Sequence, residues 1–278
     1  MVYKTILAII GAATPDQFLK QAAELCHLSE AHLSVLVVVM AAPPPIGDYA
    51  ATISDAWLEE QTEDRRKLEA KITSSRDVLS GLASGAEVEG LYCEAVWAHS
   101  RIARRAIYAD LVLIGDADII GRELRRQAID SVLFDARRPV LLVPKAAPVT
   151  LMPRKIVLAW DSSPDAAAAA REALDLMRGT DLIDIVMIEP DADGVRQGED
   201  PGTDIAAYLA HHGVKGMVDR IVADGRTIAE ALQDRAAELS ADLIVMGAYG
   251  HSRLRERIFG GVTQAMIEAA TIPVLLVR

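Results

Sequence analysis

Three short apolar segments each occur twice in this chain, in the same order and with similar sequences. Short and fully apolar runs of this kind are typical of strands that are buried on both faces of a parallel sheet. Ordered self-similarity indicates a duplicated structural unit. The sequence therefore predicts two related domains. The matched pairs are Lys4–Ala8 with Lys155–Ala159, Ala109–Gly115 with Ala241–Gly247, and Pro139–Val143 with Pro273–Val277.

Helical patterns separate the predicted strands in both copies. Strands that alternate with helices are joined by right-handed crossovers and form a doubly wound parallel sheet. The longest helical segment, residues 55–79, is highly charged with one apolar side, which predicts an amphipathic helix over a sheet face. Residues 99–108 predict a shorter helix. The proline-bearing connector 144–153 has no periodicity, so we place the domains at 1–146 and 153–278.

Glycines surround the apolar run 243–246 of the second copy. Gly247 and Gly250 follow this predicted strand, and Gly260 and Gly261 precede a helical pattern that begins near Val262. Glycine lets a backbone approach a ligand closely, and the free N–H groups of a helix N-terminus favour an anion. The stretch therefore predicts a phosphate-binding cradle, although it contains neither a Walker loop nor a dinucleotide fingerprint.

The spacing Gly247-x2-Gly250-x9-Gly260, followed by a small residue, resembles the nucleotide-binding signature of the universal stress protein family. The resemblance extends over the whole chain because the layout repeats. It implies a flavodoxin-like or Rossmann-like five-stranded parallel sheet in each domain and ATP or AMP bound between the loops after strands one and four, a site that Mg²⁺ can share. The family usually has Ser or Thr where this chain has Gly261, so one hydroxyl is lost unless Thr263 supplies it.

Further candidate ligand residues follow from the same resemblance. Asp161 matches a family position beside adenine and ribose, and Ser162 follows it; Asp161 or Ser163 also reads as the cap of a helix that starts at Pro164. Apolar positions at the ends of two strands match those against which adenine rests, although ordinary core packing explains them equally well. These positions are Ile188 and Met246, and the remaining candidates are His251, which follows Gly250, and Val262.

The first copy lacks these features. It has Gly11 and Ala12 where the second copy has Asp161, Asp118 stands at the position of the second glycine, and the segment 121–139 looks shortened. A carboxylate about 5 Å from a phosphate charge costs about 3 kcal/mol at a surface-like dielectric. We therefore expect the first domain not to bind ATP.

The amino-acid composition limits the kinds of partner that this protein is expected to bind. Acidic residues outnumber Lys and Arg by 40 to 29, and this net charge of −11 argues against nucleic acid or an anionic membrane as a partner. No apolar run approaches the ~20 residues needed to span a bilayer. Cys26 and Cys93 are the only cysteines, which predicts a reduced, cytoplasmic protein.

Three functions remain open. The first is regulatory binding of an adenine nucleotide in the C-terminal domain, with at most slow ATP hydrolysis. The second is a stress-response scaffold whose site is vestigial, which the glycine at position 261 favours. The third, an adenylating enzyme, ranks lowest because Asp161–Pro164 is not its usual loop, and His211–His212 has no further ligand at metal-binding spacing. The resemblance also implies that Val140–Val143 pairs antiparallel with Val274–Val277 as an intrachain pseudo-dimer; a homodimer of the whole chain stays open.

Overall fold

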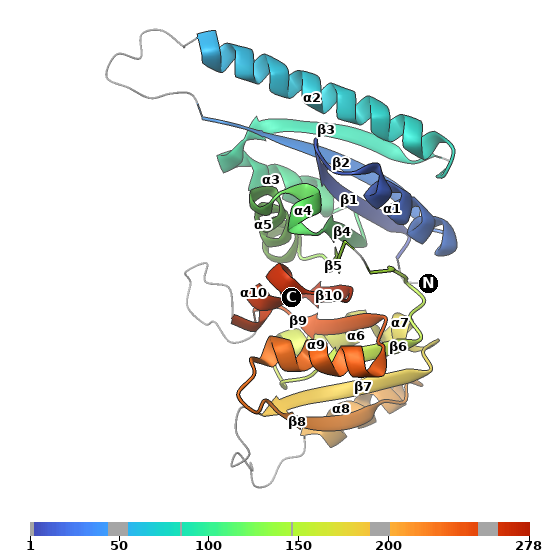
Figure 1. Ribbon diagram of the computed structural model, residues 1–278. Coiled ribbons are helices and arrows are strands. Elements are labelled where there is room, and N and C mark those ends of the chain that lie inside the picture. Colours follow the sequence, from blue (N-terminus) through green and yellow to red (C-terminus); the bar gives the residue numbers. More distant parts are fainter. Residues whose placement is uncertain (1–2, 44–54, 84, 146, 190–200, 250–260) are drawn as a thin grey trace. The chain divides into compact units, whose positions relative to one another are not determined.

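The computed structural model describes residues 3–43, 55–83, 85–145, 147–189, 201–249 and 261–278, and it divides into two compact units (Figure 1). The units are Tyr3–Arg138 and Pro139–Arg278. Both consist of a largely parallel sheet with helices on its two faces, so the predicted doubly wound α/β architecture is confirmed.

The first unit contains four parallel strands in the order β3-β2-β1-β4. Its central strand β1 is apolar and buried along nearly its whole length, as expected for a strand with neighbours on both edges and helices on both faces. The elements of this unit are β1 (Thr5–Gly11), α1 (Asp16–Leu28), β2 (His32–Ala41), α2 (Asp55–Ser80), β3 (Glu87–Glu94), α3 (Ala95–Ala106), β4 (Leu111–Gly115), α4 (Ala117–Ile120), α5 (Arg122–Asp130) and the π-helix η1 (Ser131–Ala136).

The second unit has the strand order β5-β10-β9-β6-β7-β8. The strands from β10 to β8 are parallel, whereas β5 pairs antiparallel with β10 in the register Leu141↔Leu275. By sequence β5 is the last strand of the first copy, and by its contacts it belongs to the second unit. The elements are β5 (Val140–Val143), β6 (Lys155–Ala159), α6 (Pro164–Glu172), α7 (Leu174–Met177), β7 (Leu182–Glu189), α8 (Pro201–His211), β8 (Met217–Val222), α9 (Ile228–Leu239), β9 (Leu243–Gly247), α10 (Gly261–Ala269) and β10 (Val274–Val277).

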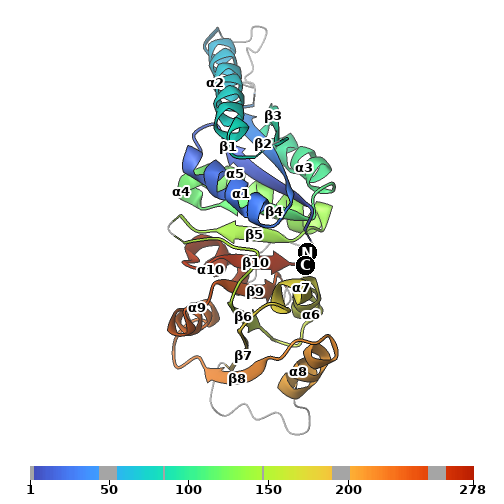
Figure 2. The same ribbon diagram turned by 90° about the vertical axis from the view of Figure 1, so that its right-hand side faces the viewer.

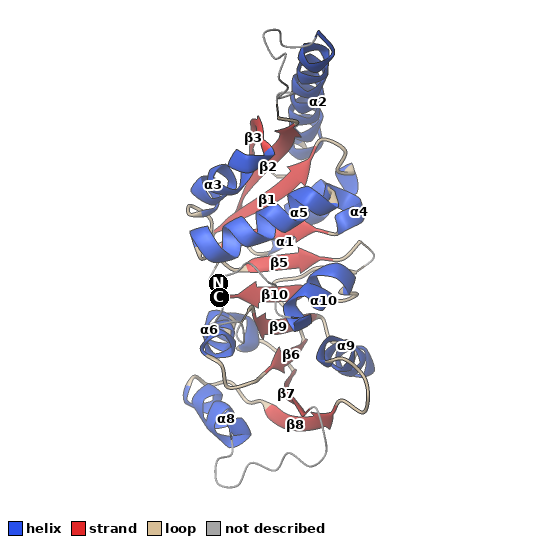
Figure 3. Ribbon diagram, turned by 90° about the vertical axis from the view of Figure 1, so that its left-hand side faces the viewer, coloured by secondary structure: helices blue, strands red, loops and turns tan. Residues whose placement is uncertain are grey.

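Helices cover both faces of the second sheet. Figures 2 and 3, which view the molecule from opposite sides, both place α6 and α8 on one face and α9 and α10 on the other. The start of α9 has a capping box, in which the Thr227 hydroxyl accepts from the Glu230 N–H and the Glu230 carboxylate accepts from the Thr227 N–H.

The duplication extends to a polar contact at the start of the sheet in each unit. Asp110, just before β4, accepts hydrogen bonds from the backbone N–H groups of Lys4 and Thr5 at 2.8 and 2.9 Å. Asp242, just before β9, accepts from Arg154 and Lys155 at the same two distances. In each copy one carboxylate therefore holds the beginning of the first strand against the beginning of the fourth. Burial raises the pKa of Asp110, but the hydrogen bonds outweigh it and the net effect is a lowered pKa.

One predicted helix of the first copy differs from the structure. Helix α3 begins at Ala95 instead of residue 99, directly at the end of β3. The segment after Gly121, which looks shortened in the sequence, forms α5 and the π-helix η1, and Arg137 directly after η1 is in the left-handed region. Both α3 and α5 are amphipathic, with Ile102 and Leu124 among their buried residues.

Candidate functional site

The candidate site of the second unit lies where its strand order reverses. Strands β6 and β9 are parallel neighbours, with Leu158 opposite Val245, so the loops that follow them start at the same edge of the sheet. In the sheet, β7 and β8 lie beyond β6 on one side, whereas β10 lies beyond β9 on the other side. In doubly wound sheets such a reversal opens a crevice between adjacent loops and is the usual ligand position.

The loop after β6 is fixed by its own polar side chains. Asp161 accepts a hydrogen bond from the Ser163 N–H at 2.9 Å, and Ser162 between them has a φ of +62°. The Ser163 hydroxyl accepts from the Ala166 N–H at 3.1 Å and caps α6, which confirms the predicted cap. Asp161 is exposed, and the hydrogen bond from the Ser163 N–H orients its carboxylate in the loop after β6.

Gly247 permits a close approach between the end of β9 and the first turn of α6. A Cβ atom at this position would lie 2.5 Å from the Ala166 nitrogen and 2.5 Å from the carbonyl carbon of Asp165. Both atoms belong to backbone and cannot rotate away, so every residue with a side chain would force the strand and the helix apart. The glycine predicted to admit a ligand is thus required first by the packing of the protein itself.

The start of α10 forms the opposite side of the candidate site. Gly261 is exposed, and a Cβ at this position would meet no described atom within 4 Å. Two residues later, the buried Thr263 hydroxyl accepts a hydrogen bond from the Tyr249 N–H at 3.2 Å. Tyr249 has a φ of +70°, an uncommon conformation for a bulky residue, and this hydrogen bond helps to hold it. Val262, which stands between Gly261 and Thr263 in the sequence, is half-buried.

The remaining predicted residues lie in different settings. Met246 is buried within β9, and Ile188 is half-buried near the end of β7, where it pairs with Ile221. Gly250, His251 and Gly260 lie outside the described residues. The structure therefore gathers the described loop residues around one strand-order reversal, at the ends of β6 and β9 and the start of α10.

Three side chains beside these loops were not among the residues predicted from the sequence: Trp160, Asp165 and Arg278. Burial raises the pKa of Asp165 in the first turn of α6; the Arg278 guanidinium opposes this and Asp161 adds to it. Trp160 precedes Asp161, and its indole N–H is buried with no hydrogen-bond partner in the described part of the chain. Buried N–H groups normally have a partner. Its position directly after β6 was the only signal in the sequence.

In the first unit the equivalent position is occupied by the protein itself. The Thr14 hydroxyl, in the loop after β1, accepts from the Gly11 N–H at 2.9 Å and donates to the Ile119 carbonyl of α4 at 3.0 Å. Ile119 and Ile120 are buried, and a Cβ on Gly11 would lie 3.1 Å from the Ile120 carbonyl oxygen. The loops after β1 and β4 are therefore joined to each other, with no gap for a nucleotide between these atoms.

Two buried cations reinforce this closure. The Lys71 ammonium, on α2, donates to the Thr14 carbonyl at 2.6 Å and to Asp16 at 2.9 Å. The Arg125 guanidinium, on α5, donates to the Gly115 carbonyl at the end of β4 at 2.8 Å. The carbonyl groups at the ends of both loops are thus satisfied by side chains of the same unit. From the sequence we predicted only that the charge of Asp118 repels a nucleotide phosphate. The contacts that join the loops after β1 and β4 were not predicted.

Metal binding and membrane insertion find no support in the residues described. No cluster of three or more His, Cys, Asp or Glu side chains lies close enough to hold a metal ion within that part of the chain. The same residues contain no helix with the length and apolar character to cross a bilayer. His212 stacks at a tilt on Tyr208, with ring centroids 4.7 Å apart.

Fold and site together define a duplicated, doubly wound α/β protein whose candidate site lies at the strand-order reversal of the second unit. Residues 152–278 match the family model described as "Universal stress protein family". A universal stress protein of Mycolicibacterium smegmatis is 27% identical over 302 aligned positions, which cover 99% of this chain and 97% of that protein. Residues 152–278 therefore match a universal stress protein family domain, and over its whole length the chain is similar to a universal stress protein.

Solved structures agree on the fold. A universal stress protein from Archaeoglobus fulgidus superposes with a TM-score of 0.67 at 17% identity, covering 98% of this chain and 96% of that one. A putative universal stress protein from Pseudomonas aeruginosa gives a TM-score of 0.53 at 17% identity, with 99% and 93% covered. Both comparisons span essentially the full chain, so the tandem arrangement of two such folds is shared.

Proposed function

We propose that this protein binds one adenine nucleotide, ATP or AMP, in the crevice of its second unit and serves a regulatory role in the stress response. The observation that carries the proposal is the close approach at Gly247. It holds the end of β9 against the first turn of α6, so that the loops after β6 and β9 begin at adjacent points. Mg²⁺ accompanies the nucleotide where a triphosphate is bound.

The start of α10 supports a phosphate position. The first N–H groups of a helix have no intrahelical partner and carry a partial positive charge. At Gly261 no side chain covers them, and the space around a Cβ is empty of described atoms. On the other side of the crevice, the Asp161 carboxylate is held by Ser163 and suits the hydroxyl groups of a ribose.

Only one site per chain is proposed. In the first unit the Thr14 hydroxyl joins the loop after β1 to α4, and Lys71 and Arg125 satisfy the neighbouring carbonyl groups. A nucleotide would have to break these contacts before it could enter. The first copy then serves as a structural companion of the second.

A vestigial site in a scaffold protein is the competing function, and one observation favours it. The Thr263 hydroxyl is buried and already accepts a hydrogen bond from Tyr249, so it is a poor replacement for the hydroxyl that the family carries at position 261. Phosphate binding then depends on backbone N–H groups alone. On this alternative the purified protein carries no nucleotide and retains a protein partner.

Calorimetric titration with ATP and Mg²⁺, and separately with AMP, tests the proposal. We expect saturable binding of one nucleotide per chain, weakened at least about tenfold by Gly261→Asp, which places a carboxylate at the helix start. Gly179→Asp is the matched control, because Gly179 is exposed, has free space around it and lies outside the crevice. No heat at millimolar nucleotide, or equal weakening by both variants, would reject the proposal.

The wider assembly is proposed on the same basis. The ladder between β5 and β10 supports an intrachain pseudo-dimer of the two copies, residues 1–146 and 153–278. The two free cysteines, Cys26 and Cys93, favour the cytoplasm. Homodimerisation of the chain is left to sedimentation analysis. Any ATP hydrolysis is expected to be slow.

A further inference from the structure

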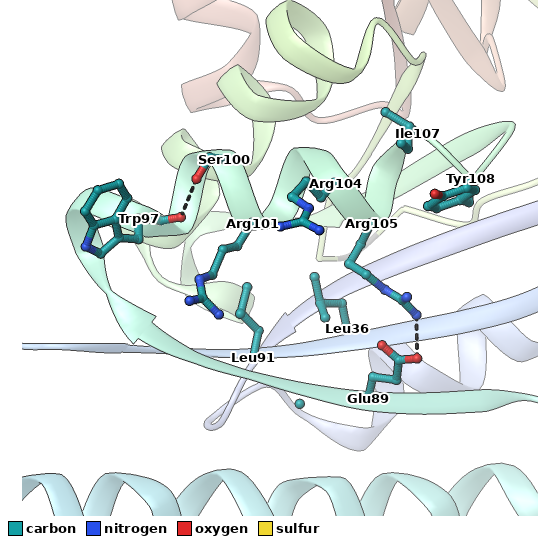
Figure 4. Close-up of a pocket in the computed structure, with 11 residues that line it drawn as sticks. Leu36, Glu89, Leu91, Trp97, Ser100, Arg101, Arg104, Arg105, Ile107 and Tyr108 are labelled. Carbon is teal, nitrogen blue, oxygen red and sulfur yellow. Dashed lines mark hydrogen bonds and ion pairs between the residues drawn. The ribbon is translucent and has the colours of Figure 1, made fainter.

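The first unit carries a groove on the sheet face opposite α2, away from its closed crevice. It lies between α3 and strands β2 and β3 and has a volume of about 650 Å³ (Figure 4). Leu36 and Leu91 form an apolar floor, and Figure 4 shows both pointing toward α3. The backbone of Gly90 also lines the groove, whereas a Cβ on it would point to the other face of the sheet, against Ile72 and Leu68 of α2. The groove therefore offers an apolar strip beneath a helix.

One wall of the groove is positively charged. Arg101, Arg104 and Arg105 stand at i, i+3 and i+4 on α3, so they share one face of the helix and extend toward the strands (Figure 4). Arg105 pairs with Glu89 at 2.5 Å. Within the described residues, Arg101 and Arg104 form no ion pair with a carboxylate. The wall thus has two uncompensated guanidinium groups on a protein whose net charge is −11.

Aromatic side chains stand at both ends of this wall. Trp97 is 58% exposed at one end and Tyr108 is 74% exposed at the other. Trp, Tyr and Arg are the residues that dominate binding energy at interfaces. Trp97 lies in α3 and Tyr108 lies two residues beyond its end, so the 11 residue steps between them span roughly 16 Å at 1.5 Å per residue. That length matches about five residues of extended chain at 3.3 Å each.

We propose that this groove binds an extended acidic peptide segment of a partner protein. Carboxylates of the peptide pair with Arg101 and Arg104, and an apolar residue between them packs on Leu36 and Leu91. A small molecule fits less well, because enclosed ligand pockets bury most of their ligand, whereas this groove is open between two exposed aromatic rings. Glu89 lies at the floor and Glu94 precedes α3; both repel a nearby carboxylate, so the acidic residues of the peptide lie toward the helix.

The test uses the full chain and a fluorescein-labelled peptide, acetyl-Asp-Glu-Leu-Asp-Phe-Glu. Fluorescence anisotropy should show saturable binding that weakens between 50 and 200 mM salt, as expected for exposed charge pairs. The amide analogue, with Asn and Gln in place of the acids, should not bind. Arg101→Glu combined with Arg104→Glu should weaken binding at least about tenfold. Circular dichroism verifies that the variant is folded.

A matched double variant controls for net charge. Arg66→Glu with Arg122→Glu makes the same charge change on exposed residues of the same unit that do not line the groove, and it should bind the peptide like the wild type. Equal loss in both double variants, binding without salt dependence, or no binding at millimolar peptide would overturn the proposal. A change of oligomeric state caused only by the groove variant would also overturn it, since the occupant would then be a second copy of this chain.

Discussion

Replacing Arg235 by Met should strongly destabilise the second unit, because it leaves a buried carboxylate without its cation. Asp184 lies in β7 with its side chain 1% exposed, and its Oδ2 accepts from the Arg235 Nε at 2.8 Å. Its other oxygen, Oδ1, is buried without a hydrogen-bond partner among the described residues. The hydrogen bond to Asp184 is also the main reason why the pKa of Arg235 is raised. Arg235 further reaches Asp219 and Glu238, which are more exposed.

The expected loss can be bounded. Removing one partner of a buried ion pair typically costs 3–5 kcal/mol. We therefore expect Arg235→Met to lower the free energy of unfolding by about 3–5 kcal/mol at pH 7.

The assay is urea unfolding followed by the fluorescence of Trp160, in a background where Trp57 and Trp97 are replaced by Phe. The backbone N–H of Trp160 donates to the Val186 carbonyl of β7, so this reporter senses the affected sheet. A loss below about 1 kcal/mol would refute the reasoning.

Two further variants make the test specific. In the double variant Arg235→Met with Asp184→Leu, an apolar pair replaces the ionic one, and most of the lost stability should return. Arg154→Met removes a cation from the pair with Asp181, whose side chains are 78% and 58% exposed. Such an exposed pair contributes at most about 1 kcal/mol. The comparison separates burial of the carboxylate from loss of an ion pair as such.

Three more predictions follow from individual contacts. Gly247→Ala should lower the thermal unfolding midpoint of the second unit and weaken nucleotide binding, because the new Cβ would meet backbone atoms of α6 at 2.5 Å. Gly261→Ser should leave this midpoint unchanged, since the Cβ has free space, and it should tighten ATP binding measured by calorimetry. Asp110→Asn should cost about 1–2 kcal/mol at pH 7 in urea unfolding; because the pKa of Asp110 is lowered by folding, this difference should shrink as the pH falls below about 4. Burial raises the pKa of Cys26 to about 12, so Ellman's reagent at pH 8 should label this thiol in the native protein far more slowly than in urea.

Sequence patterns predicted the parts of this protein in which short-range chemistry decides the structure. The strands β4, β9 and β10 are apolar throughout, and β1 and β6 are apolar after their first residue; such runs have few alternatives to a buried parallel sheet. The Ser163 cap and the start of α10 likewise depend on residues that are adjacent in the chain. The duplication also supported the predicted strand order, because the matched strands follow one another in the same order in both copies.

Contacts between distant residues could not be predicted in this way. The Thr14 hydroxyl meets Ile119 across 105 positions, and Lys71 meets Thr14 across 57. Nothing in the local pattern distinguishes a lysine that closes a crevice from one on a solvated helix face. The same holds for Gly247, for which the sequence predicted ligand access and the structure shows contact with α6. The glycines and histidine of the segment 250–260 stay predictions.

The antiparallel ladder of β5 and β10 has a consequence for how this chain can be divided. The connector after residue 143 separates the two copies in sequence, yet a cut there would remove β5 from the unit to which its contacts belong. The backbone N–H and C=O groups of Val274–Val277 that pair with β5 would then lose their partners, and they would bind water or a strand of a second molecule instead. A fragment that begins at Pro139 carries its own partner strand. The natural point of division for recombinant fragments is therefore before β5, one strand earlier than the repeat itself suggests.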